Sequence, residues 1–265
     1  MNSNTSLSEA AALQGRLWAA RPKDWADLQE RVILPAHRKV FERLAPEHGS
    51  LLLDAGCGSA GACLLAVAAG CRVHGLDASP PLLEIARERV PEGDFRHGEL
   101  LSLPWPDGTF DYVTGFNSFQ YATDPVAALA EARRVLKPGG KVGIVVWGRV
   151  EECDAVAHMK ALASLMPSAP GSPGPLAGEQ RIAEMAAEAG FTVETDERVD
   201  CPWHYPDLST ALRALKSAGP IARIIDHAGE RAVDAALADC LADFQQPENG
   251  SYQFRNKFRA LTGRS

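Results

Sequence analysis

The sequence has no apolar run that approaches the length of about 18 residues needed to cross a bilayer. It does not start with a basic segment followed by an apolar one, so we expect no signal peptide. Its six cysteines form no CxxC pair, and its seven histidines have no metal-ligand spacing. These absences predict a cytoplasmic protein that keeps its cysteines reduced, binds no metal and does not insert into a membrane.

An excess of basic residues is also lacking. The 265 residues include 27 Lys and Arg against 34 Asp and Glu, which gives a net charge of -7. Because a phosphate backbone binds basic surfaces, this balance disfavours nucleic acid as a partner. Hydrophobic residues make up 46% of the chain, which is ordinary for a globular protein.

Strands and helices alternate through the middle of the chain, between a helical start and a helical stretch near the end. Alternation of this kind predicts a mainly parallel sheet with helices on both faces. A segment rich in proline and glycine at 166–175 predicts a loop, either a plain connector or a flap beside the substrate. Strands are expected at 51–54, 72–77, 93–97, 110–116, 141–147, 191–199 and 251–260. We divide the chain into an N-terminal helical cap (1–48), a core (49–203), a helical cap insertion (204–250) and a final core strand (251–265).

A glycine-rich turn follows the first expected strand. Glycines allow a tight turn and the close approach of a ligand, which in an open α/β sheet binds at this edge. Gly56, Gly58 and Gly61 fit the G-x-G-x-x-G pattern of dinucleotide-binding proteins. An NAD(P)-dependent oxidoreductase is therefore one candidate, although the chain has no Tyr-x-x-x-Lys pair.

A carboxylate beside this turn favours a different ligand. Asp54 lies two residues before the first glycine, where a dinucleotide would place its anionic pyrophosphate. The methionine end of S-adenosylmethionine instead carries an ammonium and a sulfonium, which a carboxylate attracts. Asp77 ends the second expected strand, about 20 residues later, and could bind a ribose diol or cap a helix.

Four motifs follow one another in order. They are DAGCG at 54–58, GLDAS at 75–79, LPWPDGTFD at 103–111 and RVLKPGG at 134–140. With them the sequence resembles the class I S-adenosylmethionine-dependent methyltransferase family, especially the branch that includes ubiquinone and menaquinone methyltransferases. The family's third loop glycine is Ala60 here, so the loop is expected to be slightly reshaped.

The alternation and the resemblance together imply a doubly wound, Rossmann-like α/β fold. We expect a seven-stranded, mostly parallel sheet with an antiparallel last strand and a helical cap. The resemblance also implies S-adenosyl-L-methionine as the cofactor. Residues of its site would be Asp54, Gly56, Cys57, Gly58, Asp77, Ala78, Ser79, Glu99, Leu100, Leu101, Asn117, Trp18 and Trp25. For the two tryptophans a second reading stays open, in which they only anchor the N-terminal helices to the core.

The acceptor is expected to be a small molecule. After the fourth expected strand the chain lacks the (Asp/Asn)-Pro-Pro-aromatic motif of nucleic-acid amino-methyltransferases, and it has no Pro-Cys nucleophile of the cytosine enzymes. Phe119, Tyr121 and Trp203 are candidates for an acceptor pocket, and their alternative role is core packing. In-line methyl transfer needs no covalent intermediate, so no catalytic residue is assigned.

Weak candidates for a general base or a positioning residue are His204, Tyr205 and Asn117, with His158 weaker still. A monomer or a homodimer is expected. Two alternatives stay open: the oxidoreductase, and a non-catalytic protein that binds S-adenosylmethionine.

Overall fold

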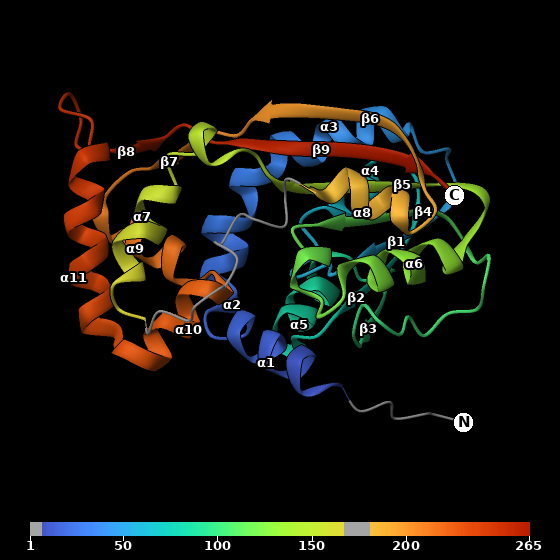
Figure 1. Cartoon of the computed structure of the whole chain (residues 1–265), viewed down its shortest axis with the longest axis horizontal. Helices are drawn as coiled ribbons and strands as arrows, with labels where there is room; N and C mark the ends of the chain where they lie inside the picture. The colour runs from blue at the N-terminus through green and yellow to red at the C-terminus, as the bar shows by residue number, and fades with distance from the viewer. Residues whose placement is uncertain (1–6, 167–180) are drawn as a thin grey trace.

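The computed structural model describes residues 7–166 and 181–265. Apart from its first residue, the loop predicted at 166–175 lies outside these ranges. The sheet has seven strands in the order β3-β2-β1-β4-β5-β9-β6 (Figure 1). The strands are β3 (Asp94–His97), β2 (Arg72–Asp77), β1 (Leu51–Ala55), β4 (Phe110–Phe116), β5 (Leu136–Trp147), β9 (Lys257–Arg264) and β6 (Thr192–Asp200). β1 to β5 are parallel and β9 is antiparallel to both its neighbours, which confirms the predicted fold class.

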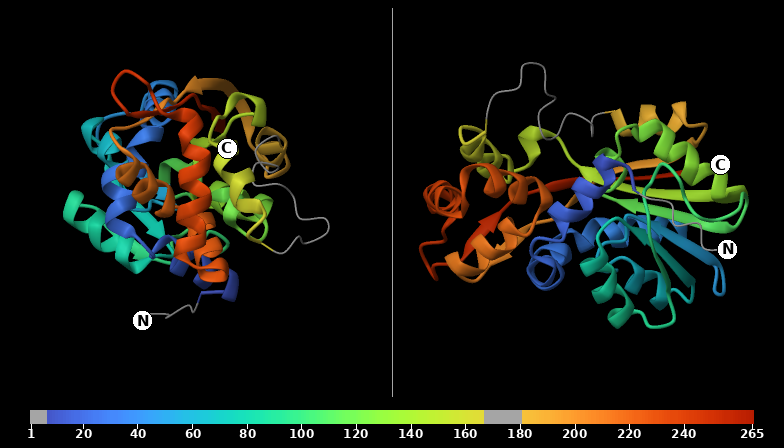
Figure 2. Two further views of the ribbon diagram at one scale, coloured as in Figure 1. Left: turned by 90° about the vertical axis from the view of Figure 1, so that its left-hand side faces the viewer. Right: turned by 90° about the horizontal axis from the view of Figure 1, so that it is seen from below.

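Helices cover both faces of this sheet (Figure 2). Successive strand residues point to opposite faces, so Leu52 joins one hydrophobic core and Leu53 joins the other. Val40 and Cys63 pack in the first core, and Leu129 packs in the second. The first core lies under α3 (Leu34–Leu44), α4 (Cys63–Ala68) and α5 (Pro80–Arg89), and the second under α6 (Pro125–Val135) and α8 (Ile182–Glu188).

A second group of helices, which we call the cap lobe, lies beyond one end of the sheet (Figure 1). The N-terminal helices run between the cap lobe and the sheet. Ion pairs join these helices to the cap lobe, including Arg16 with Asp226 at 2.6 Å. The cap lobe consists of α7 (Val156–Ala163), β7 (Trp203–Tyr205), α9 (Leu208–Lys216), α10 (Gly219–Ala228), α11 (Glu230–Leu241), η6 (Ala242–Phe244) and β8 (Tyr252–Phe254). The N-terminal elements are α1 (Glu9–Trp18), α2 (Pro22–Asp24), η1 (Trp25–Gln29) and η2 (Glu30–Ile33).

The last predicted strand, 251–260, is two strands in the structure. β8 pairs with β7 in the cap lobe, whereas β9 pairs with β5 and β6 in the main sheet. Between them, the carbonyl of Asn256 accepts the Cys201 N–H, and its side chain accepts the Ala155 N–H. Asn256 therefore bonds outside both strand ladders and separates the two strands. The alternating sequence pattern continues through this break, from the small sheet of the cap lobe into the main sheet.

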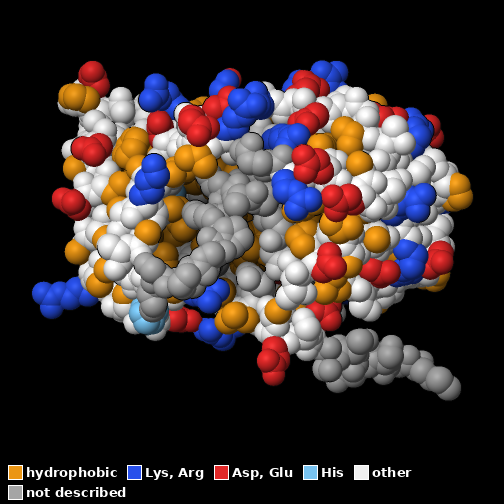
Figure 3. Space-filling view, in the orientation of Figure 1, with side chains coloured by type: hydrophobic (Ala, Val, Ile, Leu, Met, Phe, Trp, Pro, Cys, Tyr) orange, Lys and Arg blue, Asp and Glu red, His pale blue; other side chains and the backbone are white. Residues whose placement is uncertain are grey.

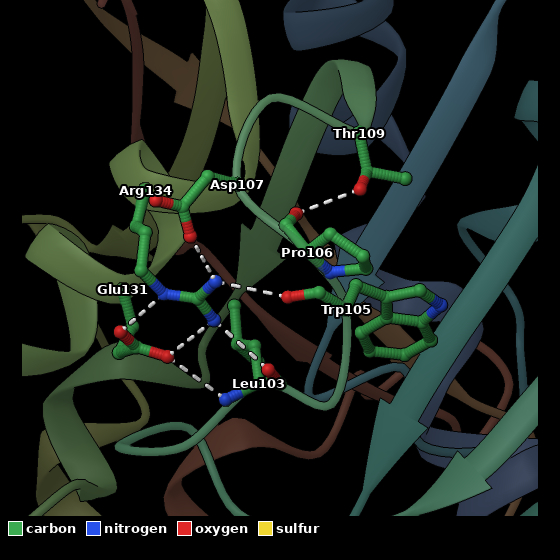
Figure 4. A network of polar contacts seen from close by, with 7 residues as sticks. All are labelled: Leu103, Trp105, Pro106, Asp107, Thr109, Glu131 and Arg134. Carbon is green, nitrogen blue, oxygen red and sulfur yellow. Dashed lines mark hydrogen bonds and ion pairs between the residues drawn. The ribbon is translucent and has the colours of Figure 1, made fainter.

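Two of the motifs that carried the resemblance hold a long loop in place. The guanidinium of Arg134 lies between the carboxylates of Glu131 and Asp107, at 2.7 and 2.8 Å (Figure 4). It also donates to the backbone carbonyls of Leu103 and Trp105, each at 2.9 Å. Arginine donates in a planar fork, so one side chain satisfies several acceptors of a loop that has no regular structure. In the described structure, these two motifs therefore have a structural role, which is to fix the loop between β3 and β4.

Charged side chains of both signs are interspersed over the face seen in Figure 3. Within residues 7–166 and 181–265, we find no helix that is both long and apolar enough to span a bilayer. The same ranges contain no group of three His, Cys, Asp or Glu side chains placed to hold a metal ion.

Candidate functional site

The turn after β1 depends on left-handed backbone conformations. Gly56 and Gly58 have φ of 82° and 51°, and a Cβ on Gly56 would lie 2.4 Å from that of Ser118. Ala60 also has a positive φ of 65°, although it carries a side chain. That conformation costs a non-glycine residue roughly 1–2 kcal/mol. The loop therefore keeps a left-handed residue where the family has its third glycine.

This turn forms the floor of a cavity that we call the loop cavity. Its empty space is about 1100 Å³, including the open mouth. Of the residues predicted from sequence for cofactor binding, all except Ser79 line it. Ser79 is fully buried and directs its backbone N–H to Asp77 at the start of α5, so its predicted place in the site is wrong.

The loop cavity is acidic. Glu30, Asp54, Asp77 and Glu99 line it, whereas its described lining contains no Lys or Arg. Carboxylates that share one cavity repel one another and favour a cationic ligand over a pyrophosphate. The predicted preference for a cationic ligand therefore depends on four acids. The sequence analysis had attributed it to Asp54 alone.

Asp54 is the most deeply buried of these acids, with 2% of its surface exposed. Its carboxylate accepts hydrogen bonds from Thr114 Oγ1 at 2.8 Å and from Cys63 Sγ at 3.6 Å. Burial raises the pKa of Asp54 to about 7, and the negative charges of Glu30 and Asp77 contribute to the rise. A cation bound nearby would oppose this shift and favour the ionised form.

Asp77 connects the glycine turn to the end of β2. One carboxylate oxygen accepts the Gly58 N–H and the other accepts the Ser79 N–H, both at 2.8 Å. Two carboxylate oxygens offer about four acceptor positions, so Asp77 keeps some capacity to accept from a ligand diol.

Helix α1 lines the loop cavity and packs unusually close to the segment after β2. Gly15 faces Ala78 there, and a Cβ at Gly15 would lie 2.0 Å from the Ala78 carbonyl oxygen. Ser8, at the N-terminus of α1, donates a hydrogen bond to Glu99. The N-terminal helix is thus placed over the segments that follow β2 and β3.

A buried ion pair that the sequence analysis missed fixes the N-terminal segment to the glycine turn. Glu30 accepts from Arg89 of α5 at 2.6 Å and from the Gly61 N–H at 3.1 Å. Arg89 also donates to the carbonyls of Ser59 and Ala26. Burial raises the pKa of Glu30, and Arg89 opposes that rise. Both residues occur in amphipathic helical stretches, where a lone Glu or Arg gives no signal of pairing.

A second cavity adjoins the first and extends into the cap lobe. Trp18, Trp25 and Tyr121 form an aromatic wall between them, with ring centroids 4.7 Å (Trp18–Trp25) and 5.6 Å (Trp18–Tyr121) apart. We call the second space the apolar cavity, because its described lining includes no Lys, Arg, Asp or Glu. Its lining includes Trp147, His158, Met159, Trp203, Leu215 and Ile221.

The predicted acceptor and catalytic residues divide into two groups. Tyr121 and Asn117 line both cavities and Trp203 lines the apolar cavity. Asn117 has a left-handed φ of 51° at the end of β4, a strained conformation of the kind found at functional sites.

Three predicted residues line neither of these two cavities. Phe119 is buried in the second hydrophobic core, where its ring packs on Gly115. His204 lies on the exposed face of β7. Tyr205 is buried, with its hydroxyl donating to Gln29 at 2.7 Å. Their assignment to the acceptor pocket or to catalysis is therefore wrong, because strand alternation turns His204 away and core packing encloses the other two.

Comparisons with known proteins agree with this geometry. A sequence model described as "Methyltransferase domain" matches residues 53–144. Demethylmenaquinone methyltransferase of Anoxybacillus flavithermus is 39% identical over 113 residues, or 40% of this chain and 48% of that protein. Malonyl-acyl-carrier-protein O-methyltransferase of Serratia marcescens is 30% identical over 195 residues, or 69% of this chain and 70% of that protein. The chain thus spans about half the length of the first relative.

A solved structure extends the likeness to most of the fold. The crystal structure of the (4+2)-cyclase SpnF matches with a TM-score of 0.55 and 27% identity, and covers 86% of this chain and 80% of that chain. The Serratia match covers more than two thirds of both proteins, and the methyltransferase-domain match includes the glycine turn, so the predicted resemblance is confirmed. The chain belongs to the S-adenosylmethionine-dependent methyltransferase family.

Proposed function

We propose that the chain binds S-adenosylmethionine in the loop cavity and transfers its methyl group to a neutral, mainly apolar small molecule in the apolar cavity. The observation that carries this proposal is the pair of adjoining cavities, one acidic and one without charge, which share an aromatic wall. Membership of the methyltransferase family supports the first half. The composition of the apolar cavity supports the second.

In the loop cavity, each group of the cofactor would have a chemical counterpart. The carboxylates of Asp54 and Glu30 would attract the ammonium, and Asp77 would accept from the ribose hydroxyls. Leu100 and Leu101 would pack against the adenine ring. The sulfonium supplies an activated methyl group, so the protein has only to align the acceptor and exclude water.

The shared aromatic wall would lie where transfer takes place. A sulfonium near the face of an aromatic ring gains roughly 0.5–2 kcal/mol from cation–π attraction. Trp18 and Trp25 are placed to supply it from the N-terminal segment. Asn117, at the end of β4, would orient the acceptor or the methyl donor from the opposite side.

The absence of charge in the described lining of the apolar cavity restricts the acceptor. A buried carboxylate or phosphate without a cation is costly, so charged acceptors are disfavoured. Residues 167–180 contain no Lys or Arg in sequence and could not supply one. The Serratia relative is named for malonyl-acyl carrier protein, whose free carboxylate would have no partner here.

The direct test is methyl transfer itself. Incubation of the purified protein with S-adenosylmethionine and a panel of neutral phenols, quinols and apolar amines should release S-adenosylhomocysteine in stoichiometric amounts with a methylated product. Aromatic carboxylic acids of similar size, tested in parallel, should give none. Binding of S-adenosylhomocysteine without turnover of any acceptor would instead favour a binding role or a different reaction. Binding of NAD(P) would overturn the cofactor assignment.

We expect Asp77→Ala to weaken S-adenosylhomocysteine binding at least tenfold, or about 1.4 kcal/mol. The variant would lose both ribose contacts and would release the Gly58 N–H that positions the glycine turn. Calorimetry on the variant and on Glu92→Ala, an exposed acid before β3, would measure the difference. Equal affinity in Asp77→Ala and wild type would remove Asp77 from the site.

A further inference from the structure

Two buried polar atoms in the apolar cavity have no partner. They are His158 Nδ1 and Trp203 Nε1, which form no hydrogen bond within the described part of the chain. The two residues are 5% and 2% exposed, and their ring centroids lie 6.3 Å apart. Buried polar atoms in folded proteins nearly always have partners, so these two need an explanation.

Their position in the apolar cavity distinguishes them from the other unpaired atoms of the described residues, because Ser118 Oγ belongs to the loop cavity and the rest belong to residues that line neither space. Trp105 Nε1 and Asn256 Nδ2 are also unpaired, but neither residue lines the loop cavity or the apolar cavity. His158 comes from α7 and Trp203 from β7, two elements that are far apart in sequence. A ligand in the apolar cavity would therefore lie beside both rings that carry these atoms, and beside neither of the other two side chains.

The chemistry of the two side chains restricts the group that they would bind. The indole N–H of Trp203 can only donate, so it requires an oxygen or nitrogen with a free lone pair. A neutral imidazole ring nitrogen can accept, and burial lowers the pKa of His158 to about 4, which keeps the ring neutral at pH 7. A hydroxyl accepts from one partner and donates to the other. An ether leaves the imidazole unpaired, and a carboxylate lacks a cation.

We propose that His158 and Trp203 determine acceptor specificity by binding the hydroxyl group of a neutral aromatic molecule of the phenol class. The role of the apolar cavity as the acceptor site rests on the proposed function. Binding of the hydroxyl does not, because it depends only on the two unpaired atoms and the uncharged walls.

Binding of four probes of similar size would test this assignment. The probes are 2-naphthol, 2-methoxynaphthalene, naphthalene and 2-naphthoate, each titrated into protein saturated with S-adenosylhomocysteine. We expect 2-naphthol to bind about tenfold more tightly than naphthalene, because it alone pairs both buried atoms. The methoxy compound should fall between them, and 2-naphthoate should not bind. Equal affinity of naphthol and naphthalene would overturn the proposal.

Variants would locate the hydroxyl site. His158→Phe and Trp203→Phe keep an aromatic ring but remove the polar atom, so each should reduce the preference for naphthol at least fivefold and leave naphthalene binding within twofold. The matched control is His204→Phe, which changes the exposed neighbour of Trp203 on β7 and should alter nothing.

A preference that survives in both cavity variants would place the hydroxyl elsewhere and overturn the proposal. The wild-type probe series remains decisive if a variant fails to fold. Failure to release S-adenosylhomocysteine from S-adenosylmethionine would count against the proposed function alone, because the probes report binding without turnover.

Discussion

Between pH 4 and pH 8, the variant Asp54→Asn is expected to gain about 4 kcal/mol of stability relative to wild type. The pKa of Asp54 is raised from 3.8 to about 7 by burial. Between these values the folded state holds a proton that the unfolded chain has lost, so the wild-type free energy of unfolding falls as pH rises. Each pKa unit corresponds to about 1.36 kcal/mol, and asparagine has no such proton to lose.

Denaturant unfolding of both proteins at several pH values would measure this difference. The buried His37 and His158, whose pKa values are lowered to about 3 and about 4, act in the opposite direction, but they do so equally in both proteins and cancel in the comparison. Asp226→Asn, in an exposed ion pair, is the matched control and should show no comparable trend. Parallel pH curves for wild type and Asp54→Asn would contradict the prediction.

Cofactor binding should respond to the same group. An ammonium beside Asp54 favours the ionised carboxylate, so binding of S-adenosylhomocysteine near pH 7 should release a proton from wild type. Calorimetry in buffers of different ionisation enthalpy would detect that proton. The release should disappear in Asp54→Asn, and affinity in wild type should increase as pH rises through 7.

Glu30→Ala is expected to reduce the free energy of unfolding by about 3 kcal/mol, the lower end of the range for breaking one side of a buried ion pair. The side chains of Glu30 and Arg89 are only 11% and 24% exposed, so water would compensate Arg89 poorly. The Gly61 N–H would also lose its acceptor. Because the pair holds the N-terminal segment against the glycine turn, S-adenosylhomocysteine binding should weaken as well.

Two controls separate the effect of burial from the effect of charge. Glu42→Ala removes the exposed partner of Lys39 and should cost less than about 0.5 kcal/mol. The double variant Glu30→Met with Arg89→Met removes both charges and should be less destabilised than Glu30→Ala. Thermal or denaturant unfolding of the three variants would measure these differences. A cost for Glu30→Ala no larger than that for Glu42→Ala would show that the pair is not structural.

The local pattern of the sequence determined the framework and one half of the site. Apolar strands alternating with amphipathic helices allow few arrangements other than a doubly wound sheet, because each element must bury one face. Gly56 and Asp54 lie only two residues apart in sequence at the end of a strand, so their joint meaning could be inferred without coordinates. Asp77 could be placed beside them because parallel strands end at the same edge.

Only the tertiary structure brought together the other residues around the two cavities. Glu30 and Arg89, or His158 and Trp203, come from elements that are far apart in sequence, and nothing local indicates that they meet. The alternation over 251–260 likewise gave no indication that Asn256 separates a strand of the small sheet from a strand of the main sheet. Periodicity reports which face of an element is buried, whereas its partner depends on packing between distant segments. The glycine turn and its neighbouring acids could therefore be inferred from the sequence, while the pairing of distant residues around the two cavities depended on the fold.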